Sequence, residues 1–569
     1  VAFNLDFRND GGKYYWRNLY SDFSDQEFRS RNELKFDDGE ATSGTSTSAQ
    51  WTGSNIEKQM KDRLEEQSIL SSVIGGENYF NRWTFDYSYA YSKSQESEPD
   101  RLDTTFELEG VDLGYTSTGP VPAVVLGDEA FDPENFIINE LEYLDGKTED
   151  TVNTVKLNAL LDIFSDGYNG NIKFGALYRA REKTNDVTNI FYEDPAEPTL
   201  EPFATAGPRF GLSSFGPGLD ATAIRSYFNA NRDSFDISED DTIVGSAANN
   251  FSMNEDVAAA YLMSTYENGP LRVVYGVRYE ATDFESQGFR TVVTEDGTAA
   301  VPESFANDYD NVLPSLNLRY EFADNWLFRA AATQTIARPN FEDLRPGGEI
   351  EIDEGELEAE IGNPGLSPVE STNIDLGVEW YPGGVSMVSL GLFYKDLENF
   401  IVTADIAEII DLEDLVGNLP VDDAEVIAPI NGDSAELLGL EAAFVYQFES
   451  GLYLSGNGTF VDSEATYFER PDKTTLPRTP EVVLNGAIGF ESTRFGLRLA
   501  ANYRDQALIG FEDLTDPAFD VFQDEHLQVD FSARWNITRE LQLSFAAINL
   551  TDEPFYAYFG QSRFNAQYE

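Results

Sequence analysis

The stretch 82–93, RWTFDYSYAYSK, alternates large aromatic side chains with smaller polar ones. In an extended chain one face would carry all of its aromatics, Trp83, Phe85, Tyr87, Tyr89 and Tyr91. A period of two is typical of a β-strand with one apolar face. That face could contact either the core of a protein or the hydrocarbon of a lipid bilayer.

The composition favours strands throughout the chain. The 569 residues include 41 Phe and 28 Tyr but only 4 Met and no Cys, which are proportions typical of β-sheet proteins. The mean hydropathy is −0.37 and no run of about 18 apolar residues occurs, so a membrane-spanning helix is excluded. A membrane-spanning β-barrel stays open.

The charge and the missing residue types exclude several functions. With 38 basic and 102 acidic residues the formal charge is −64, which argues against binding nucleic acid through its phosphates. The absence of Cys and the single histidine, His526, argue against thiolate or histidine catalysis and against clustered metal ligands. We therefore expect no enzyme activity, no resident metal and no cofactor. Acidic runs such as 349–362 are interpreted as solvated surface, with a calcium site as the alternative.

Other strands carry charges on the face opposite the apolar one. In 271–280, LRVVYGVRYE, and in 494–504, RFGLRLAANYR, arginines alternate with aliphatic and aromatic side chains. The core of a β-sandwich tolerates few such charges, whereas a wide, water-filled lumen tolerates many. The pattern therefore favours a transmembrane antiparallel β-barrel.

The lengths of the connections support the same fold. Tight links are predicted at 266–271, 321–326, 381–386, 448–453, 490–495 and 535–541. Long connections are predicted at roughly 95–150, 190–254, 337–369, 401–435, 465–479 and 506–524. Short turns at one end and long loops at the other are typical of an outer-membrane barrel with its long loops outside the cell.

Strand parity gives a count. About 18 spanning strands are predicted, from roughly 1–8 to 539–550, with 102–115 as a further strand inside an external loop. The first strand would then run toward the periplasm and the last away from it. A barrel with both termini in the periplasm would need further strands at both ends, about 22 in all.

Four stretches resemble a known family: LPSLNLRYEF (313–322), ATQTIARPNFEDLRP (332–346), NPGLSPVESTNIDLGVEWY (363–381) and INLTDEPFYAYFG (548–560). They are similar to barrel signatures of TonB-dependent outer-membrane receptors, notably of the Caulobacter, Xanthomonas and Alteromonas group. The resemblance covers about 255–569 well. It implies a 22-stranded barrel in the outer membrane of a Gram-negative bacterium, surrounded by lipid and lipopolysaccharide. It also implies an N-terminal plug and uptake driven by the TonB–ExbB–ExbD system.

The two ends of the sequence depart from this family pattern. No plug-like stretch precedes Val1, and FNAQYE ends the chain where the family continues into a strand with a terminal aromatic. We therefore expect 1–569 to be a receptor β-barrel without the plug and the terminal strand.

Two long connections supply the candidate ligand-binding residues. Within 190–254, the stretch 220–235 is predicted to form a short helix that begins after Asp220. Its aromatics could bind a sugar, or they could form a small core that keeps the loop folded. Arg338 and Asn340 follow a strand at 326–336, where they could contact ligand or end the strand. The candidates are Phe215, Tyr227, Phe228, Asn229, Asn231, Arg338 and Asn340. We expect both loops to form one site, so that deleting 205–235 would abolish binding.

The function that these inferences favour is TonB-dependent uptake of a scarce nutrient. The ligand would be a small molecule or an oligosaccharide, or otherwise a siderophore-type compound, although the acidic surface disfavours an anionic ferric complex. The first alternative is a passive porin or structural barrel without a plug. The second is a soluble β-rich protein that binds or hydrolyses sugars.

Overall fold

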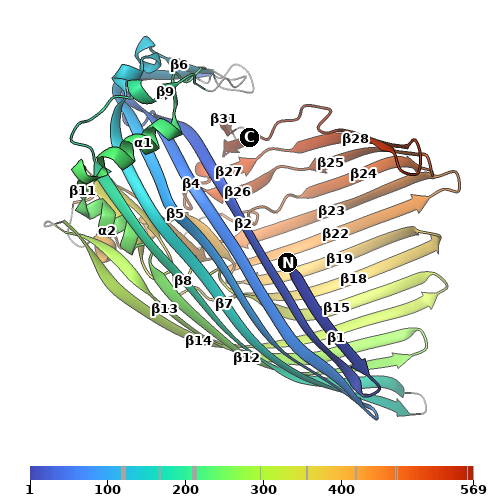
Figure 1. The fold of residues 1–569 in the computed structure, drawn as a ribbon. Helices are drawn as coiled ribbons and strands as arrows, with labels where there is room; N and C mark the ends of the chain where they lie inside the picture. The colour runs from blue at the N-terminus through green and yellow to red at the C-terminus, as the bar shows by residue number, and fades with distance from the viewer. Residues whose placement is uncertain are drawn as a thin grey trace.

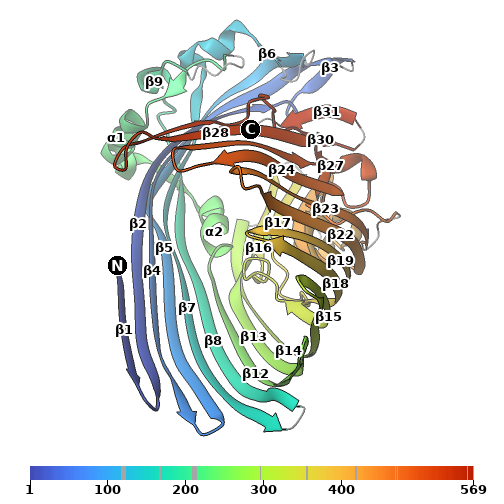
Figure 2. The same cartoon turned by 90° about the vertical axis from the view of Figure 1, so that its right-hand side faces the viewer.

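One antiparallel sheet of 21 strands dominates the structure (Figures 1 and 2). The computed structural model describes residues 1–569 except 46, 117–122, 166–167, 208–213, 295–296, 354–355, 417–419, 468–469, 471, 561 and 568–569. Three short strands pair only at the margin of the sheet, β3 (Glu40–Thr45), β6 (Ala123–Leu126) and β11 (Asp236–Ser238). The other 18 pair with one another in chain order, which confirms the predicted number and the antiparallel fold.

These 18 strands are β1 (Ala2–Asn9), β2 (Gly12–Lys35), β4 (Ser48–Phe80), β5 (Trp83–Thr116), β7 (Ile137–Ser165), β8 (Tyr168–Glu193), β12 (Phe251–Asn268), β13 (Leu271–Thr294), β14 (Gly297–Ala323), β15 (Trp326–Ala337), β18 (Val369–Gly383), β19 (Ser386–Glu398), β22 (Ser434–Gln447), β23 (Leu452–Thr466), β24 (Val482–Glu491), β25 (Phe495–Arg504), β28 (His526–Asn536) and β29 (Gln542–Ala547). The six tight links predicted from the sequence each join two neighbouring strands of this set. Figure 1 shows the tight links together at one end of the sheet.

Smaller elements fill the connections at the other end. The short sheets are β9 (Ala204–Thr205) with β10 (Gly218–Leu219); β16 (Gly348–Asp353), β17 (Glu356–Ile361), β21 (Asp423–Asn431) and β20 (Ile401–Asp405); and β26 (Ala507–Phe511), β27 (Asp520–Gln523), β30 (Ala557–Phe559) and β31 (Ser562–Gln567). The helices are α1 (Ala221–Asn231), α2 (Glu239–Ala247), α3 (Glu413–Val416) and the 3₁₀ turns η1 (Asp128–Phe131), η2 (Pro133–Asn135), η3 (Glu201–Phe203), η4 (Arg232–Ser234), η5 (Ala407–Ile409) and η6 (Pro517–Phe519). Among the described residues, none of these helices has the length and apolar character needed to cross a membrane.

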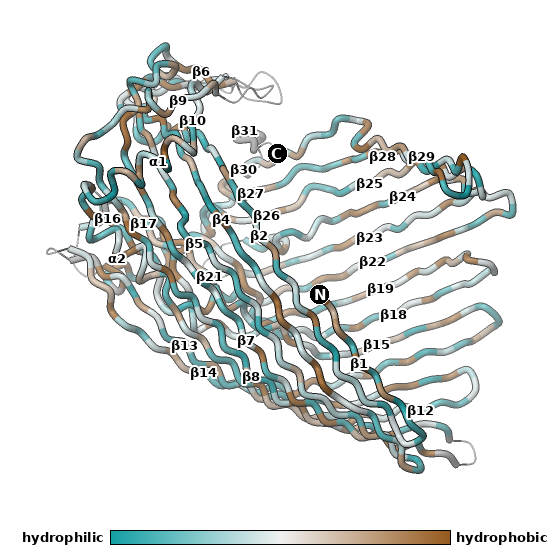
Figure 3. Tube along the Cα trace, viewed as in Figure 1, coloured by the Kyte–Doolittle hydropathy of each residue, from teal (hydrophilic) through white to brown (hydrophobic). Residues whose placement is uncertain are grey.

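The sheet curves strongly, so that it has a convex outer and a concave inner face (Figure 2). Over the described residues β1 pairs with β2 and β29 pairs with β28, and no pairing joins β1 to β29. Figure 3 shows hydrophobic and hydrophilic residues alternating along the strands, as expected when opposite faces meet different surroundings.

The aromatic stretch that begins β5 lies on the outer face. Phe85, Tyr87 and Tyr89 are 39–45% exposed, and Val155 and Leu157 pair with Tyr89 and Tyr87 from β7. No protein core covers these rings in the described structure, which confirms that the apolar half of this strand faces outward. A broad, exposed apolar surface of this kind is the surface that a lipid bilayer would cover.

The outer face provides a test of membrane insertion. Replacing Tyr87 by Arg is expected to lower the free energy of unfolding from lipid vesicles by about 2–4 kcal/mol, because a guanidinium would replace a phenol at the depth of the bilayer. Ser88→Arg places the same group on the inner face and serves as the matched control. Urea unfolding in vesicles measures both variants, and equal losses would contradict the assigned orientation of β5.

The first half of the sheet extends far beyond the length that a bilayer needs. β4 and β5 have 33 and 34 residues, whereas β24 and β25 have 10 each, and about 9–11 residues suffice to cross the hydrocarbon. The predicted loop at 95–150 is therefore wrong over most of its length. Residues 102–115 form a strand as predicted, but as the end of β5 and not as a separate strand. β5 and β7 stay paired from Trp83–Leu161 to Glu107–Ile137. Apolar and polar side chains keep alternating there, so the strand period continues above the membrane.

Helix α2 completes the edge of β8 where its partner strand ends. The pairing of β12 with β8 stops at Asn185. Beyond it, the backbone N–H groups of Val187, Asn189 and Phe191 donate hydrogen bonds of 2.6, 2.9 and 3.1 Å to side-chain oxygens of Asn250, Ser246 and Thr242, respectively. Thr242 and Ser246 belong to α2, and Asn250 ends the turn after it; the three residues are spaced by four, and the N–H groups by two residues of the strand. The helix and the turn after it therefore satisfy backbone donors that a further strand would otherwise satisfy.

Candidate ligand-binding site

Helix α1 forms as predicted and belongs to a small core. The Asp220 side chain accepts a hydrogen bond of 3.0 Å from the Ala223 backbone N–H, which caps the helix. Phe228 is fully buried, with its ring centroid 5.8 Å from that of Tyr143 and 5.6 Å from that of Tyr192. This burial supports the interpretation of the aromatics as the core of the loop, because a fully buried ring has no surface for a ligand.

The neighbouring candidates also have structural partners. The Tyr227 hydroxyl donates a 2.5 Å hydrogen bond to Asp194, and burial together with this carboxylate raises the pKa of Tyr227 to about 12. The Asn231 amide donates to the Tyr227 carbonyl at 2.9 Å, whereas Asn229 is exposed. The Phe215 carbonyl accepts a 2.6 Å hydrogen bond from Lys58 of β4. Of these four residues, only Asn229 presents an exposed side chain.

Helix α1 of the first candidate loop and Arg338 of the second lie on opposite faces of the sheet. The positions of Tyr178 and Tyr192 differ by an even number in a ladder without register shifts, so both side chains lie on the same face of β8. Tyr178 is exposed on the outer face, and Phe228 packs against Tyr192 on that face. Arg179 lies on the inner face, and Arg338 contacts the same carboxylate as Arg179. Residues of α1 therefore lie on the other side of the sheet from Arg338. Asn249 of the first loop nevertheless donates a 2.7 Å hydrogen bond to Glu349 of the second, so a joint site of the two loops stays a prediction for these parts of them.

Arg338 is part of the inner wall. Its guanidinium donates to Glu280 at 2.6 Å and to the Thr282 hydroxyl at 3.0 Å, and Asn340 beside it is exposed. The segment that follows folds against the wall, where the rings of Phe341 and Phe284 lie 5.9 Å apart. The strand ends at Ala337 as expected, and Arg338 fixes the connection inside the lumen.

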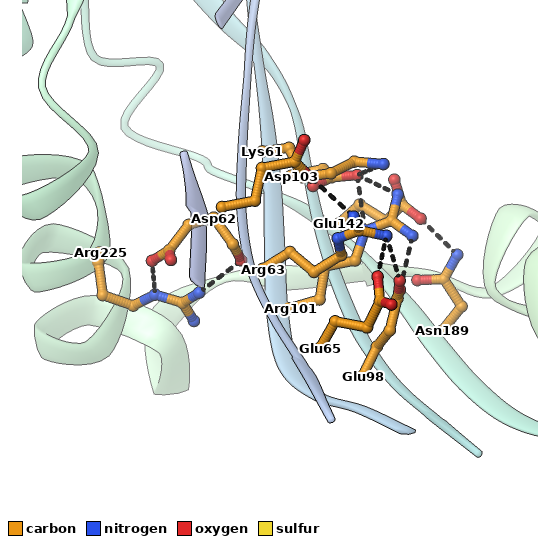
Figure 4. Close-up of polar contacts among 11 residues, drawn as sticks. Lys61, Asp62, Arg63, Glu65, Glu98, Arg101, Asp103, Glu142, Asn189 and Arg225 are labelled. Carbon is orange, nitrogen blue, oxygen red and sulfur yellow. Dashed lines mark hydrogen bonds and ion pairs between the residues drawn. The ribbon is translucent and has the colours of Figure 1, made fainter. Parts of the chain in front are cut away.

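A group of ion pairs covers the inner face of the extended strands (Figure 4). Its members are Lys61, Arg63, Glu65, Glu98, Arg101 and Asp103. The Glu98 carboxylate of β5 joins this strand to β4, because Arg63 of β4 contacts it at 2.6 Å, and Arg101 of β5 contacts it at 3.2 Å. Figure 4 also shows the opposite side of β4, where Arg225 of α1 binds Asp62 at 2.7 Å and holds the helix on the outer face.

Two adjoining cavities lie against this inner wall. Their volumes are about 360 and 410 Å³, and they share Thr148, Asn185 and Asn249. The charged residues are Glu96, Glu98, Arg101, Glu142, Lys147 and Glu349 in the first cavity, and Lys183, Glu342, Asp343, Arg345 and Glu360 in the second. The shared residues form a hydrogen-bonded row, from Thr148 to Asn185 at 2.6 Å and from Asn185 to the Asn249 carbonyl at 2.7 Å. Together these inner cavities form a polar, acidic site of a size suited to a small ligand.

Glu142 is a partly buried carboxylate in this wall, within the part of β7 above the membrane. Burial, and then the nearby Asp103, raise its pKa, while the Asn189 amide donates to it at 2.7 Å. Glu140, two residues earlier, has its pKa raised to about 7, first by burial and then by Glu142. The sequence analysis missed these residues because it assigned 95–150 to a loop. Glu140 and Glu142 are two residues apart, a spacing that places both side chains on one face of a strand, and this spacing was the signal that the sequence offered.

Comparison with known proteins agrees with this architecture. Residues 89–550 match the family model described as TonB dependent receptor-like, beta-barrel. The fold is similar to that of the ferric yersiniabactin uptake receptor FyuA from Yersinia pestis, with a TM-score of 0.50 and 12% identity over 100% of this chain and 75% of that one. It is also similar to the ferric-catecholate import receptor Fiu from K12 E. coli, with a TM-score of 0.51 and 11% identity over 99% and 80%.

No curated protein matches the sequence. The match to the family model nevertheless extends from the aromatic stretch of β5 to the end of β29 and includes every long connection between them. This chain belongs to the family of TonB-dependent receptor β-barrels.

Proposed function

We propose that this barrel takes up a scarce polar nutrient across the outer membrane of a Gram-negative bacterium, in a cycle driven by TonB. The observation that carries the proposal is the contrast between the two faces of one sheet. The outer face exposes apolar rings, and the inner face holds ion pairs, amides and the polar cavities. Family membership supports TonB-dependent uptake as the use of such a lumen.

The ligand that the inner cavities favour is a hydroxyl-rich compound without net negative charge, an oligosaccharide before a siderophore-type complex. Seven acidic and four basic residues line the two cavities, so an anionic ferric complex would meet net repulsion. Amides and paired charges offer the hydrogen-bond donors and acceptors that sugar hydroxyls need. The fold shared with FyuA and Fiu, named for ferric yersiniabactin uptake and ferric-catecholate import, keeps a siderophore-type ligand as the second candidate.

The proposal includes the remaining parts of the transport system. Residues 1–569 would act as the barrel, lipid and lipopolysaccharide would surround its outer face, and a plug would connect it to TonB–ExbB–ExbD. Arg338 and Asn340, on the inner wall, remain candidates for ligand contact. We propose transport without catalytic turnover, since the sequence offers no thiol and only one histidine.

Energy dependence distinguishes this function from that of a passive porin. We would measure uptake of a labelled oligosaccharide mixture by cells with and without the gene, before and after a protonophore collapses the inner-membrane gradient. TonB-dependent uptake should fall to the level of the deletion strain after the collapse.

A deletion of tonB is the genetic control and should have the same effect as the protonophore. Gene-dependent uptake that continues in both conditions would overturn the proposal in favour of a passive barrel. Swelling of vesicles that contain the purified protein would support that alternative.

A further inference from the structure

Three carboxylates of the first inner cavity have no cationic partner. Glu96, Glu142 and Glu349 each accept a hydrogen bond from a neutral amide, that of Gln67, Asn189 and Asn249 respectively, at 3.0, 2.7 and 2.7 Å. Within the described ranges no lysine or arginine forms an ion pair with any of the three. The Arg101 guanidinium in the same cavity is already paired with Glu98 and Asp103. The cavity therefore carries negative charge that the protein does not neutralise by direct contact.

A buried acceptor in the same cavity also lacks a partner. Asn189 is 5% exposed, and its side-chain nitrogen must be the atom that faces Glu142, because a carboxylate accepts and does not donate. Its Oδ1 atom has no hydrogen-bond partner among the described residues. Asn189 and Glu142 both line the first cavity, and Figure 4 shows the two side chains facing each other. Because an unpaired buried carbonyl is costly, a donor supplied from outside the protein would stabilise this arrangement.

The spacing of the acidic groups argues against a metal ion as the group that binds in this cavity. Among the described side chains no three carboxylates lie close enough together to hold a metal. The charge is instead distributed around a cavity of about 360 Å³, which has room for an organic group. An ammonium group offers three donors and no acceptor, so it can satisfy an amide oxygen and a carboxylate together.

We propose that this cavity is a subsite for a protonated primary amine on a hydroxyl-rich ligand. The ammonium lies between Glu142 and the Asn189 oxygen, and neighbouring hydroxyls bond to Asn185 and Asn249. For its role in transport this assignment rests on the proposed uptake function. Binding itself is a property of the purified chain and needs neither TonB nor energy.

The test compares two probes that differ in charge, the trimer of glucosamine and its fully N-acetylated form. Titration calorimetry on the full chain in detergent should show tighter binding of the amine form, by about tenfold or more, because acetylation removes the charge and two donors. Glu142→Gln should weaken binding of the amine form by about tenfold and leave the acetylated form within about twofold.

Glu149→Gln is the matched control. Glu149 lies on the same strand, lines neither cavity and pairs with Lys93 and Lys147 at 2.7 Å, so its replacement should change neither affinity. Heat modifiability on gels checks that each variant folds. If Glu142→Gln does not fold, Glu349→Gln takes its place with the same expected selective loss.

The outcomes separate this inference from the proposed function. Equal affinity for both probes, absence of binding, or equal effects of the Glu142 and Glu149 variants would overturn the amine subsite. Selective binding in detergent together with energy-independent uptake in cells would support the subsite and overturn only the TonB-driven cycle.

Discussion

Replacing Arg470 by Ala is expected to destabilise the connection between β25 and β28 by about 3–5 kcal/mol. The Arg470 side chain is fully buried and donates two hydrogen bonds, of 2.8 and 2.7 Å, to the Asp520 carboxylate. A third contact, at 3.3 Å, reaches the Leu514 carbonyl, and the guanidinium lies 5.1 Å from the centroid of the Phe511 ring. Removing the cation leaves the carboxylate buried without its charge partner, and this accounts for the size of the effect.

Hydrogen exchange by mass spectrometry would measure the loss, as faster exchange in peptides from 505–523. Arg272→Ala is the control, because Arg272 is 52% exposed and its pair with Glu267 should contribute at most about 1 kcal/mol. Exchange in 505–523 that stays as slow as in the parent protein would show that the connection does not depend on this pair. The strands should keep their protection in both variants.

The segment 220–235 around α1 is called the cap below. Replacing Phe228 by Ala is expected to lower the free energy of unfolding of this cap by about 3–5 kcal/mol. The ring is fully buried among Tyr143, Tyr192 and Phe235, and the surrounding aromatics cannot all move into the space it leaves. We expect rapid proteolysis within 205–235 while the sheet stays folded. Phe131→Ala is the control, since Phe131 is 46% exposed.

The same variant tests the separation of the two faces. Because α1 packs on the outer face, loss of the cap should leave binding to the inner cavities within about twofold, a change of less than about 0.5 kcal/mol. The sequence analysis predicted instead that removal of 205–235 abolishes binding, and this variant distinguishes the two expectations. A large loss of affinity in Phe228→Ala would show that the cap and the lumen are coupled through the strands.

The fold could be predicted because its two signals are local. Alternation of side chains marks each strand, and the tight links at 266–271 and 321–326 mark the ends of hairpins. The length by which strands such as β4 and β5 extend beyond the bilayer could not be predicted in the same way. In 102–115 apolar residues such as Leu102 and Phe106 alternate with polar ones, and sequence alone does not show that α1 covers them.

The candidate site was harder to predict because bulges decide which side chains face the lumen. Glu98 and Arg101 both face inward, although three positions separate them and strict alternation would place them on opposite faces. The irregularity includes Asp100, whose φ of +60° is uncommon for a residue other than glycine. Without knowledge of this bulge, Arg101 would be assigned to the outer face and its pair with Glu98 would be missed.

The contacts between α2 and β8 limit the length of such a helix. Four residues of an α-helix rise about 6.0 Å, whereas two residues of a strand advance about 6.6 Å, so the two repeats diverge by about 0.6 Å at each step. Thr242 and Ser246 belong to α2 and make contacts of 3.1 and 2.9 Å, whereas the third contact, of 2.6 Å, comes from Asn250 at the end of the turn after the helix. The helix itself thus matches the strand over a single step, within which a divergence of about 0.6 Å is tolerable. A chain that leaves the helix after nine residues can correct the mismatch at the next contact, which a longer straight helix could not do.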